Sequence, residues 1–320
     1  MLCWLGDARD GARFEEFKNG VLRKYGADSA YVKRCIALDE IVPVLKALGD
    51  KSKAEIVLYI KNYLRMRECY LNRGNQVMKV NGYLYETHMH TKESSACAHN
   101  TGAEMARAYK EAGYTGIIIT DHFFYGNTAI DRSLPWRDWV EQFCKGYEHA
   151  KAEGDKIGLQ VFFGWESGYR GTEFLVYGLD KEWLLAHPEI VDATIEEQYT
   201  LVHEGGGIVS HAHPFREEDY IAEIRLFPEY VDAVEGVNAM HSSDVSNSHK
   251  NPLFNERAME YGRQHGLPFT AGSDQHTTFM IGGGMVFPRK LADIHDFTQA
   301  VVNRETLKLL DGTAQGITFN

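Results

Sequence analysis

The sequence predicts an α/β protein whose main part is a β/α barrel preceded by a helical segment. From residue 76 onward, short apolar runs of strand length alternate with amphipathic stretches of helix length. This alternation is typical of parallel β/α units. About seven such units fill roughly 230 residues, which suits a closed barrel because an eight-unit barrel takes about 250. Residues 1–75 lack this alternation, so we place the domain boundary there and expect the barrel over 76–320.

Residues 1–75 are expected to form an N-terminal helical extension. The segments DEIVPVLKAL and SKAEIVLYIKNYLRMRECYL carry apolar residues three and four positions apart, which is typical of amphipathic helices. Ser52 and Glu55 have the spacing of a capping box at the start of the second helix. This segment shows no pattern of metal ligands, so we interpret it as a helical cap or an oligomerisation element of the main domain.

The first strand of the barrel is expected in a hairpin. QVMKV and YLYETH flank Asn81 and Gly82, and an Asn-Gly pair between strand-like runs is a strong hairpin signal. The first helix after it has Thr101 and Glu104 as a capping box and Gly113 as its stop. The remaining expected strands are GIIIT at 116–120, LQVFFGW at 159–165, EFLVYG at 173–178, GGIVS at 206–210, DAVEGV at 232–237 and PFTAG at 268–272.

Composition narrows the possible partners. The formal net charge is −11, and long nucleic acid is an unlikely partner because phosphate backbones need a basic surface. No apolar run of about 18 residues exists, so we expect no membrane-spanning helix. The 5 cysteines are scattered and odd in number, which indicates reduced thiols in a cytoplasmic protein. The sequence leaves the oligomeric state open.

Histidines and carboxylates follow the expected strands at their carboxyl ends, where a β/α barrel carries its chemistry. His88 and His90 follow the first strand, and Glu86 shares their face if the strand stays extended. The later strand ends offer Asp121, His122, Glu166, His211, His213, Asn238, His241, Asp274 and His276. Imidazole and carboxylate bind zinc, manganese or iron, with about four to six donors per ion. These donors suffice for two or three divalent ions.

Five segments in order, ETHMHT, AYKEAGYTGIIITDHF, GWES, SHAHPFR and AGSDQH, resemble the PHP (polymerase and histidinol phosphatase) metal-dependent phosphoesterases over residues 84–300. The resemblance implies a distorted (β/α)7 TIM-like barrel holding two or three divalent transition-metal ions (Zn, Mn or Fe). It implies a first ion on His88, His90, Glu166 and Asp274, a second on Glu166 and His213, and a third on His122 and His276.

Two ligands of that pattern are not fixed by the sequence. For the third ion, spacing leaves Glu93, Cys97 and His99 open, and we choose His99 because Glu93 follows a lysine in an expected substrate loop. The family often has a second-ion histidine on the strand after Glu166. Here that strand offers Glu173 and Phe174, so either Glu173 substitutes, or His211 does, or the second site is weaker.

The resemblance predicts a metal-dependent phosphoesterase that hydrolyses a small phosphate ester with a metal-activated hydroxide. Arg216 is the expected phosphate-binding cation, with Arg170 and Lys92 as alternatives. We expect His241 to protonate the leaving group and Asp121 to orient a neighbouring imidazole. The alternatives are an amidohydrolase-type enzyme acting on an amide or lactone, and a metal-bound structural or regulatory module without catalysis.

Overall fold

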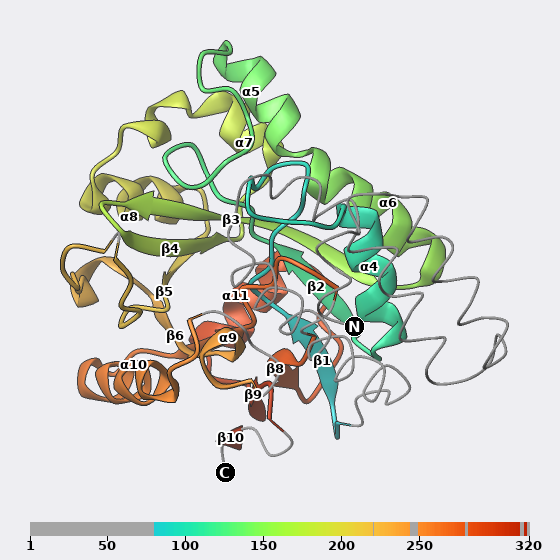
Figure 1. Ribbon diagram of the computed structural model, residues 1–320, viewed down its shortest axis with the longest axis vertical. Coiled ribbons are helices and arrows are strands. Elements are labelled where there is room, and N and C mark those ends of the chain that lie inside the picture. Colours follow the sequence, from blue (N-terminus) through green and yellow to red (C-terminus); the bar gives the residue numbers. More distant parts are fainter. Residues whose placement is uncertain (1–79, 220, 244–248, 279–280, 314–316, 319–320) are drawn as a thin grey trace, which may run out of the picture. The chain divides into compact units, whose positions relative to one another are not determined.

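The computed structural model describes residues 80–219, 221–243, 249–278, 281–313 and 317–318 (Figure 1). The predicted helical extension 1–75 lies outside them. The described strands are β1 (Tyr83–Glu86), β2 (Gly116–Ile119), β3 (Gln160–Tyr169), β4 (Thr172–Tyr177), β5 (Ile208–Ala212), β6 (Ala233–Asn238), β7 (Phe269–Gly272), β8 (Gly283–Phe287), β9 (Lys308–Asp311) and β10 (Ile317–Thr318). The described helices are α4 (Gly102–Glu111), α5 (Trp136–Phe143), α6 (Lys145–Ile157), α7 (Lys181–Ala186), α8 (Ile195–Glu204), α9 (Ala239–Ser242), α10 (Pro252–His265) and α11 (Ile294–Val302), with 3₁₀ turns η1 (Pro188–Val191) and η2 (Pro228–Tyr230).

The strands of the described residues form one sheet in the order β10-β9-β8-β1-β2-β3-β4-β5-β6-β7. β1, β2 and β3 are parallel neighbours, and so are β5, β6 and β7. Helix α4 connects β1 to β2, and α5 and α6 connect β2 to β3, as Figure 1 shows. The predicted α/β barrel class is therefore confirmed, and the carboxyl ends of these strands meet at one end of the sheet.

The predicted run of parallel units is wrong at β4. This strand is antiparallel to both β3 and β5. A tight turn at Arg170 and Gly171, whose φ angles are 51° and 85°, joins β3 to β4 without a helix. An apolar run such as EFLVYG predicts a buried strand but carries no information about its direction, so the sequence pattern alone did not reveal the hairpin.

β1 has a neighbouring strand on each edge. Tyr83–Tyr85 pair antiparallel with β8, and the other edge pairs with β2. The segment before Asn81, predicted as the hairpin partner, lies outside the described residues except for Val80, which is not in a strand. The predicted hairpin therefore stays a prediction.

The sheet comes close to closing where β1 and β7 end. The backbone N–H of His90 donates to the carbonyl of Gln275 at 2.8 Å, and that of Gln275 donates to the carbonyl of His88 at 3.3 Å. A Cβ on Gly272 would lie 2.3 Å from the Cβ of His88, so glycine permits this close approach. The closure brings the first and last predicted ligand segments together.

Local signals in the sequence account for the ends of α4. Thr101 and Glu104 form the predicted capping box, with each side chain bonded to the other's backbone N–H. The helix ends at Glu111 with Ala112 as its C-cap. Gly113 follows with a φ of 90°, a conformation that glycine adopts without steric cost.

Apolar side chains fill the space between the sheet and the helices. Trp139 on α5, Trp165 on β3 and Phe174 on β4 are fully buried in one apolar cluster. Tyr85, Phe287 and Phe297 belong to a second cluster. None of the described helices is long and apolar enough to cross a bilayer. The strand ends that carry the polar residues are thus supported by a packed core.

Candidate metal centre

His88 and His90 follow β1 directly and enter a buried polar cluster. Met89 between them packs into the apolar core, so the two imidazoles point the other way. The Nε2 atoms of His88 and His90 lie 3.3 Å apart. His90 Nε2 is also 3.0 Å from Asp274 Oδ1. The ends of β1 and β7 therefore supply two imidazoles and one carboxylate to one point.

Glu166, near the middle of β3, links this group to two further imidazoles. Its Oε1 lies 3.2 Å from His88 Nε2 and 3.0 Å from His213 Nε2. Its Oε2 lies 2.7 Å from His122 Nδ1. The Glu166 side chain is 1% exposed, so the carboxylate sits at the centre of the cluster. A carboxylate between several imidazoles is the arrangement expected of a bridging ligand.

The third group consists of stacked imidazoles. The ring centroid of His90 lies 4.2 Å from that of His122 and 4.4 Å from that of His276. Donor atoms within 4.8 Å of one another occur in four sets: His88, His90 and Asp274; His88, Glu166 and His213; His122, Glu166 and Glu173; and His90, His122 and His276. The structure thus brings together every predicted metal ligand except His99.

Two of these predicted ligands have an uncommon backbone conformation. His213 has a φ of 24° and Asp274 a φ of 50°. Positive φ is rare for residues other than glycine, costs on the order of 1–3 kcal/mol, and clusters at functional sites. Both residues come just after a strand, β5 or β7, where the backbone departs from the extended form. The cost is consistent with side chains placed for a site rather than for the sheet.

The cluster has the chemistry of a metal site. Glu166 Oε2 and His122 Nδ1 are buried and have no partner in hydrogen-bond geometry among the described residues, although they lie only 2.7 Å apart. Nitrogen and oxygen atoms that are close but not aimed at each other suit a shared cation. Burial favours the neutral acid, but His88 and His122 hold the pKa of Glu166 well below its usual range. The carboxylate is therefore charged, as a ligand must be.

The negative charge of the cluster changes the pKa values of its imidazoles. Burial disfavours a charged His88, but Glu235, Asp274 and Glu166 hold its pKa well above the ordinary value. Glu166 likewise raises the pKa of His122 against the effect of burial. Burial and two neighbouring imidazoles instead hold the pKa of His90 well below its ordinary value. The negative charges of the cluster thus attract positive charge to its centre.

Glu235 on β6 supports the cluster from behind and was not predicted. Its Oε1 lies 2.9 Å from His88 Nδ1, and its Oε2 accepts hydrogen bonds from the His213 backbone and from Asn238. A carboxylate on the far nitrogen of a ligating histidine fixes the tautomer that leaves the near nitrogen free. The signal in the sequence was a single glutamate inside the apolar run DAVEGV.

Comparison with known proteins gives a partial match. A family model described as PHP-associated matches residues 252–306, a segment that runs from α10 through β7 and Asp274 to α11. In this segment the chain is similar to the PHP-associated family. No curated protein matches the sequence.

Several solved structures are similar to this chain at low identity. A two-domain protein from Bacteroides vulgatus containing a predicted PHP-like metal-dependent phosphoesterase is 15% identical, with a TM-score of 0.47, over 72% of this chain and 66% of that one. PsfC from Pseudomonas syringae is 20% identical, with a TM-score of 0.46, over 74% and 93%. An amidohydrolase from Chromobacterium violaceum is 15% identical, with a TM-score of 0.42, over 62% and 88%. This chain thus spans just under two thirds of the Bacteroides protein.

The expectation that Glu86 faces the cluster is wrong. Its Oε1 accepts hydrogen bonds from the backbone N–H groups of Thr87, His88 and Ser273 at 2.9 to 3.1 Å. Its Oε2 accepts from the Tyr109 hydroxyl. The chain turns onto the Glu86 carboxylate where β1 ends, so the strand alternation stops before His88. Glu86 joins β1 to β7 instead of binding a metal.

Asp121 acts through its neighbours. It accepts hydrogen bonds at 2.6 Å from the backbone and hydroxyl of Thr91 and from the Ser95 hydroxyl. The Ser95 hydroxyl is in turn 3.2 Å from His90 Nδ1. Burial raises the pKa of Asp121 to about 6 despite these bonds. Asp121 therefore holds the loop after His90, and through Ser95 it positions that imidazole.

The structure does not bring His99 to the third group. His99 is exposed, and its backbone N–H bonds to the carbonyl of His276. Glu93 accepts hydrogen bonds from the Gly102 backbone and from His149, so it caps α4. Cys97 is half-buried, and its thiol belongs to none of the donor sets found among the described residues. Burial raises the pKa of the Cys97 thiol, but His122 and His276 lower it to about 7 overall.

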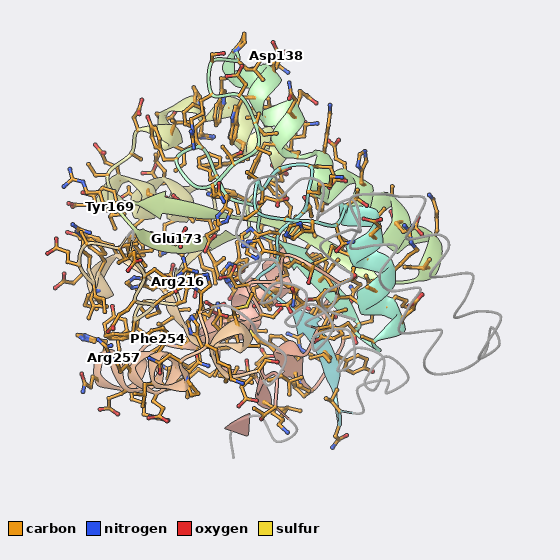
Figure 2. The ribbon with its side chains drawn as sticks, viewed as in Figure 1. Asp138, Tyr169, Glu173, Arg216, Phe254 and Arg257 are labelled. Atoms are coloured by element: carbon orange, nitrogen blue, oxygen red, sulfur yellow. The ribbon has the colours of Figure 1, made fainter. Side chains whose placement is uncertain are left out.

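Glu173 and Arg216 border the cluster, and Figure 2 shows them near each other between β4 and the segment after β5. Arg216 forms ion pairs with Glu173 and with Asp274 Oδ2, the latter at 3.1 Å. His213 Nε2 lies 3.6 Å from Glu173. Of the two alternatives for the second ion, Glu173 is therefore in place. His211 instead stacks on Phe174 within the apolar core.

His241 is next to the cluster but is not poised as an acid. Its Nδ1 lies 3.1 Å from the Asn255 side-chain oxygen, so Nδ1 carries the hydrogen and donates it. Its buried Nε2 has no hydrogen-bond partner among the described residues. Burial lowers the pKa of His241 to about 3. The neutral ring therefore offers an acceptor at Nε2, opposite to the role predicted for it.

Proposed function

We propose that this chain is a PHP-type metal-dependent phosphoesterase acting on a small phosphate ester. The observation that carries the proposal is the joined set of imidazoles and carboxylates around Glu166, next to a buried arginine. His88, His90, Glu166 and Asp274 would hold one ion. Glu166, His213 and Glu173 would hold a second, and His122 and His276 a third.

Bound divalent ions supply Lewis acidity and lower the pKa of water towards about 7. The chain's part is to hold the donors in place. Asp274 and Glu166 carry the negative charge that retains the cations, and Glu235 and Asp121 orient the His88 and His90 imidazoles. The mixture of nitrogen and oxygen donors suits zinc, manganese or iron.

Arg216 is the cation that would bind the phosphoryl group. It lines a cleft together with Glu173 and His213, and the rest of the lining comes from Gly171, Thr172, Ala212, Pro214, Ile221, Glu223, Ile224 and Arg225. A planar guanidinium pairs with two phosphate oxygens at once. The alternatives are less well placed, because Lys92 is exposed and the Arg170 guanidinium lies over the Tyr169 ring. The cleft thus has both apolar and charged walls.

The leaving group needs a proton donor other than His241. The neutral ring at His241 can accept a hydrogen bond from a substrate hydroxyl at Nε2, but it has no proton there to give. Solvent water polarised at the site is the remaining source in this proposal. Replacing His241 by Asn would then change the Michaelis constant more than the turnover number.

The experiment compares substrate classes on the full chain loaded separately with zinc, manganese and iron. A panel of phosphate esters is measured beside amides and lactones. The proposal predicts turnover of phosphate esters, and turnover of amides or lactones alone would assign the chain to amidohydrolase chemistry. No turnover of any class by fully loaded protein would favour a structural or regulatory module.

Arg216→Gln tests the phosphate contact. Loss of a preorganised partner for transition-state charge typically costs on the order of 100-fold in turnover, and we expect a loss of that size with metal content maintained. Arg257→Gln is the matched control, since Arg257 is exposed and pairs with Glu217. Equal activity of the two variants would remove Arg216 from the mechanism.

A further inference from the structure

Arg216 pairs with two carboxylates of the candidate metal centre. Its Nη1 donates to Asp274 Oδ2 at 3.1 Å, and its Nη2 donates to Glu173 Oε2. The Arg216 side chain is 7% exposed and the Glu173 side chain 14%, so solvent ions screen the contact little. In the proposed function the same guanidinium binds the substrate phosphoryl group. One cation is thus shared between the metal centre and the substrate.

The backbone places Arg216 against Glu173. In the β4–β5 pair, Glu173 lies opposite Ala212, the last residue of β5. The chain turns directly after β5, where the Arg216 backbone N–H donates to the His213 carbonyl at 3.0 Å. This turn brings residue 216 back towards β4, and both side chains line the same cleft. The ion pair is therefore built into the two strands and the turn that follows them.

The Glu173 oxygen that bonds to Arg216 also faces metal-binding groups. Glu173 Oε2 lies 3.6 Å from His213 Nε2, which in turn lies 3.0 Å from Glu166 Oε1. Two ligand atoms of one zinc ion, each about 2.0–2.2 Å from the metal, are separated by about 3–4 Å. Glu173 also belongs to a donor set with Glu166 and His122. A divalent ion bound here would meet the guanidinium at the Glu173 carboxylate.

We propose that Arg216 and a divalent ion compete for the Glu173 carboxylate, so that filling this metal position releases Arg216 for the substrate phosphoryl group. Two positive charges at one buried carboxylate repel each other, and the repulsion is strong where the effective dielectric constant is low. The ion held by Glu173 is therefore the most weakly bound of the set. The pair with Asp274 keeps the guanidinium beside the cleft when Glu173 turns to the ion. The inference rests on the proposed phosphoesterase function and adds to it a coupling between this ion and the substrate.

The competition predicts that the ion and a phosphate group bind cooperatively. An ion on Glu173 leaves Nη2 of Arg216 to an anion, and an anion on Arg216 leaves Glu173 to the ion. Such coupling is reciprocal, so each ligand raises the affinity of the other by the same factor. Manganese(II) is the probe for the ion and inorganic phosphate the probe for the phosphoryl group. Neither measurement depends on turnover.

Calorimetric titration of the metal-free full chain with manganese(II) measures the affinity of each ion. Without phosphate, Arg216→Gln should raise the affinity of the most weakly bound ion by about 10-fold or more, the size of one charge-assisted hydrogen bond. In a Glu173→Gln background, Arg216→Gln should not raise it, because the contested carboxylate is gone. Arg257→Gln is the matched control, since Arg257 is exposed and pairs with Glu217, and it should leave every affinity unchanged.

The same titrations in saturating inorganic phosphate measure the coupling. In the unaltered chain, phosphate should raise the affinity of the most weakly bound ion, and Arg216→Gln should remove most of this gain. An equal gain in Arg216→Gln would show that phosphate acts on the ion without Arg216, and would overturn the coupling. An unchanged affinity in Arg216→Gln without phosphate, or the same rise in the Glu173→Gln background, would overturn the competition.

A crystal structure of the unaltered chain with manganese(II) and inorganic phosphate tests the inference without a variant. Glu173 should contact an ion, and Arg216 should contact phosphate instead of Glu173. Arg216 still bonded to Glu173 in the loaded chain would overturn the inference alone. Failure of the unaltered chain to bind either manganese(II) or zinc would overturn both the inference and the metal-dependent function. Cooperative binding of the two probes without turnover of any phosphate ester would overturn the function and support the inference.

Discussion

His88 and Glu235 form a wholly buried pair, with Nδ1 of the imidazole 2.9 Å from Oε1 of the carboxylate. His88 follows β1 and Glu235 lies on β6, and these strands are not neighbours in the sheet. The carboxylate lies on the side of the ring away from Glu166. This relationship fixes which nitrogen of His88 faces the cluster, and it requires the barrel to be assembled.

Replacing Glu235 by Gln should weaken metal binding without removing a ligand. The amide keeps the shape of the side chain but loses the charge that holds the His88 ring, and such partners typically account for about 10–100-fold in metal affinity or activity. Competition with a metal-binding dye measures the affinity. Glu229→Gln, an exposed position close to β6, is the control. The same metal affinity in both variants would show that the charge of Glu235 does not support metal binding.

Metal loading should release protons. In the metal-free chain the pKa values of His88 and His122 lie well above their ordinary value, so both rings carry a second proton at neutral pH. A metal ligand must be the neutral ring. The apparent affinity should therefore rise with pH above 6.5, until the pH passes these raised pKa values.

Indicator dye in weakly buffered solution measures the protons released per chain on loading. His122→Gln should release fewer protons than the unaltered protein. His203→Gln should release the same number, because His203 is exposed and pairs with Asp232 away from the cluster. Loading without proton release would contradict the charge state that the cluster imposes.

Gly272→Ala should disturb the candidate metal centre, because Gly272 lies where β7 approaches the segment after β1. The new Cβ would lie 2.3 Å from His88 Cβ and 2.8 Å from the His88 backbone nitrogen, so β1 and β7 must move apart. Overpacking of this kind typically costs about 1–3 kcal/mol, and it should also lower metal affinity because Asp274 follows β7. Denaturant unfolding and metal binding are measured together.

Gly168→Ala is the matched control for that substitution. Gly168 lies on β3, and a Cβ there would be 3.6 Å from its nearest neighbour atom, the Gly126 Cα. This is an ordinary contact, so stability and metal affinity should be maintained. If Gly272→Ala behaves like the control, the close approach of β1 and β7 does not determine the geometry of the cluster.

The sequence predicted the grouping of those candidate ligands that follow strands. His88, His122, His213 and Asp274 each follow a recognisable apolar run, and parallel strands bring their carboxyl ends together. Seven predicted ligands consequently lie in one connected cluster. The direction of β4 was not predictable, because a buried strand has the same apolar pattern in both directions.

The sequence also did not predict contacts that depend on loop geometry. Glu86 has the right spacing for a ligand, but its carboxylate bonds the backbone that follows it. His99 and Cys97 differ by two positions, and their spacing could not show that Cys97 is half-buried and His99 exposed. Glu235 supports His88 from another strand, and no spacing rule links two residues separated by most of the barrel.

The most direct test of the account is metal content measured together with turnover on the same sample. Elemental mass spectrometry counts ions per chain in protein purified without chelator, and a generic phosphate ester reports hydrolysis. We predict two or three transition-metal ions and measurable turnover.

In Glu166→Gln, loss of the bridging charge should lower the ion count and reduce turnover by more than about 100-fold, beyond the range typical of supporting residues. Glu141→Gln, exposed and paired with Lys181, should match the unaltered protein. One ion or none after reconstitution, or full turnover in Glu166→Gln, would contradict a bridged metal centre.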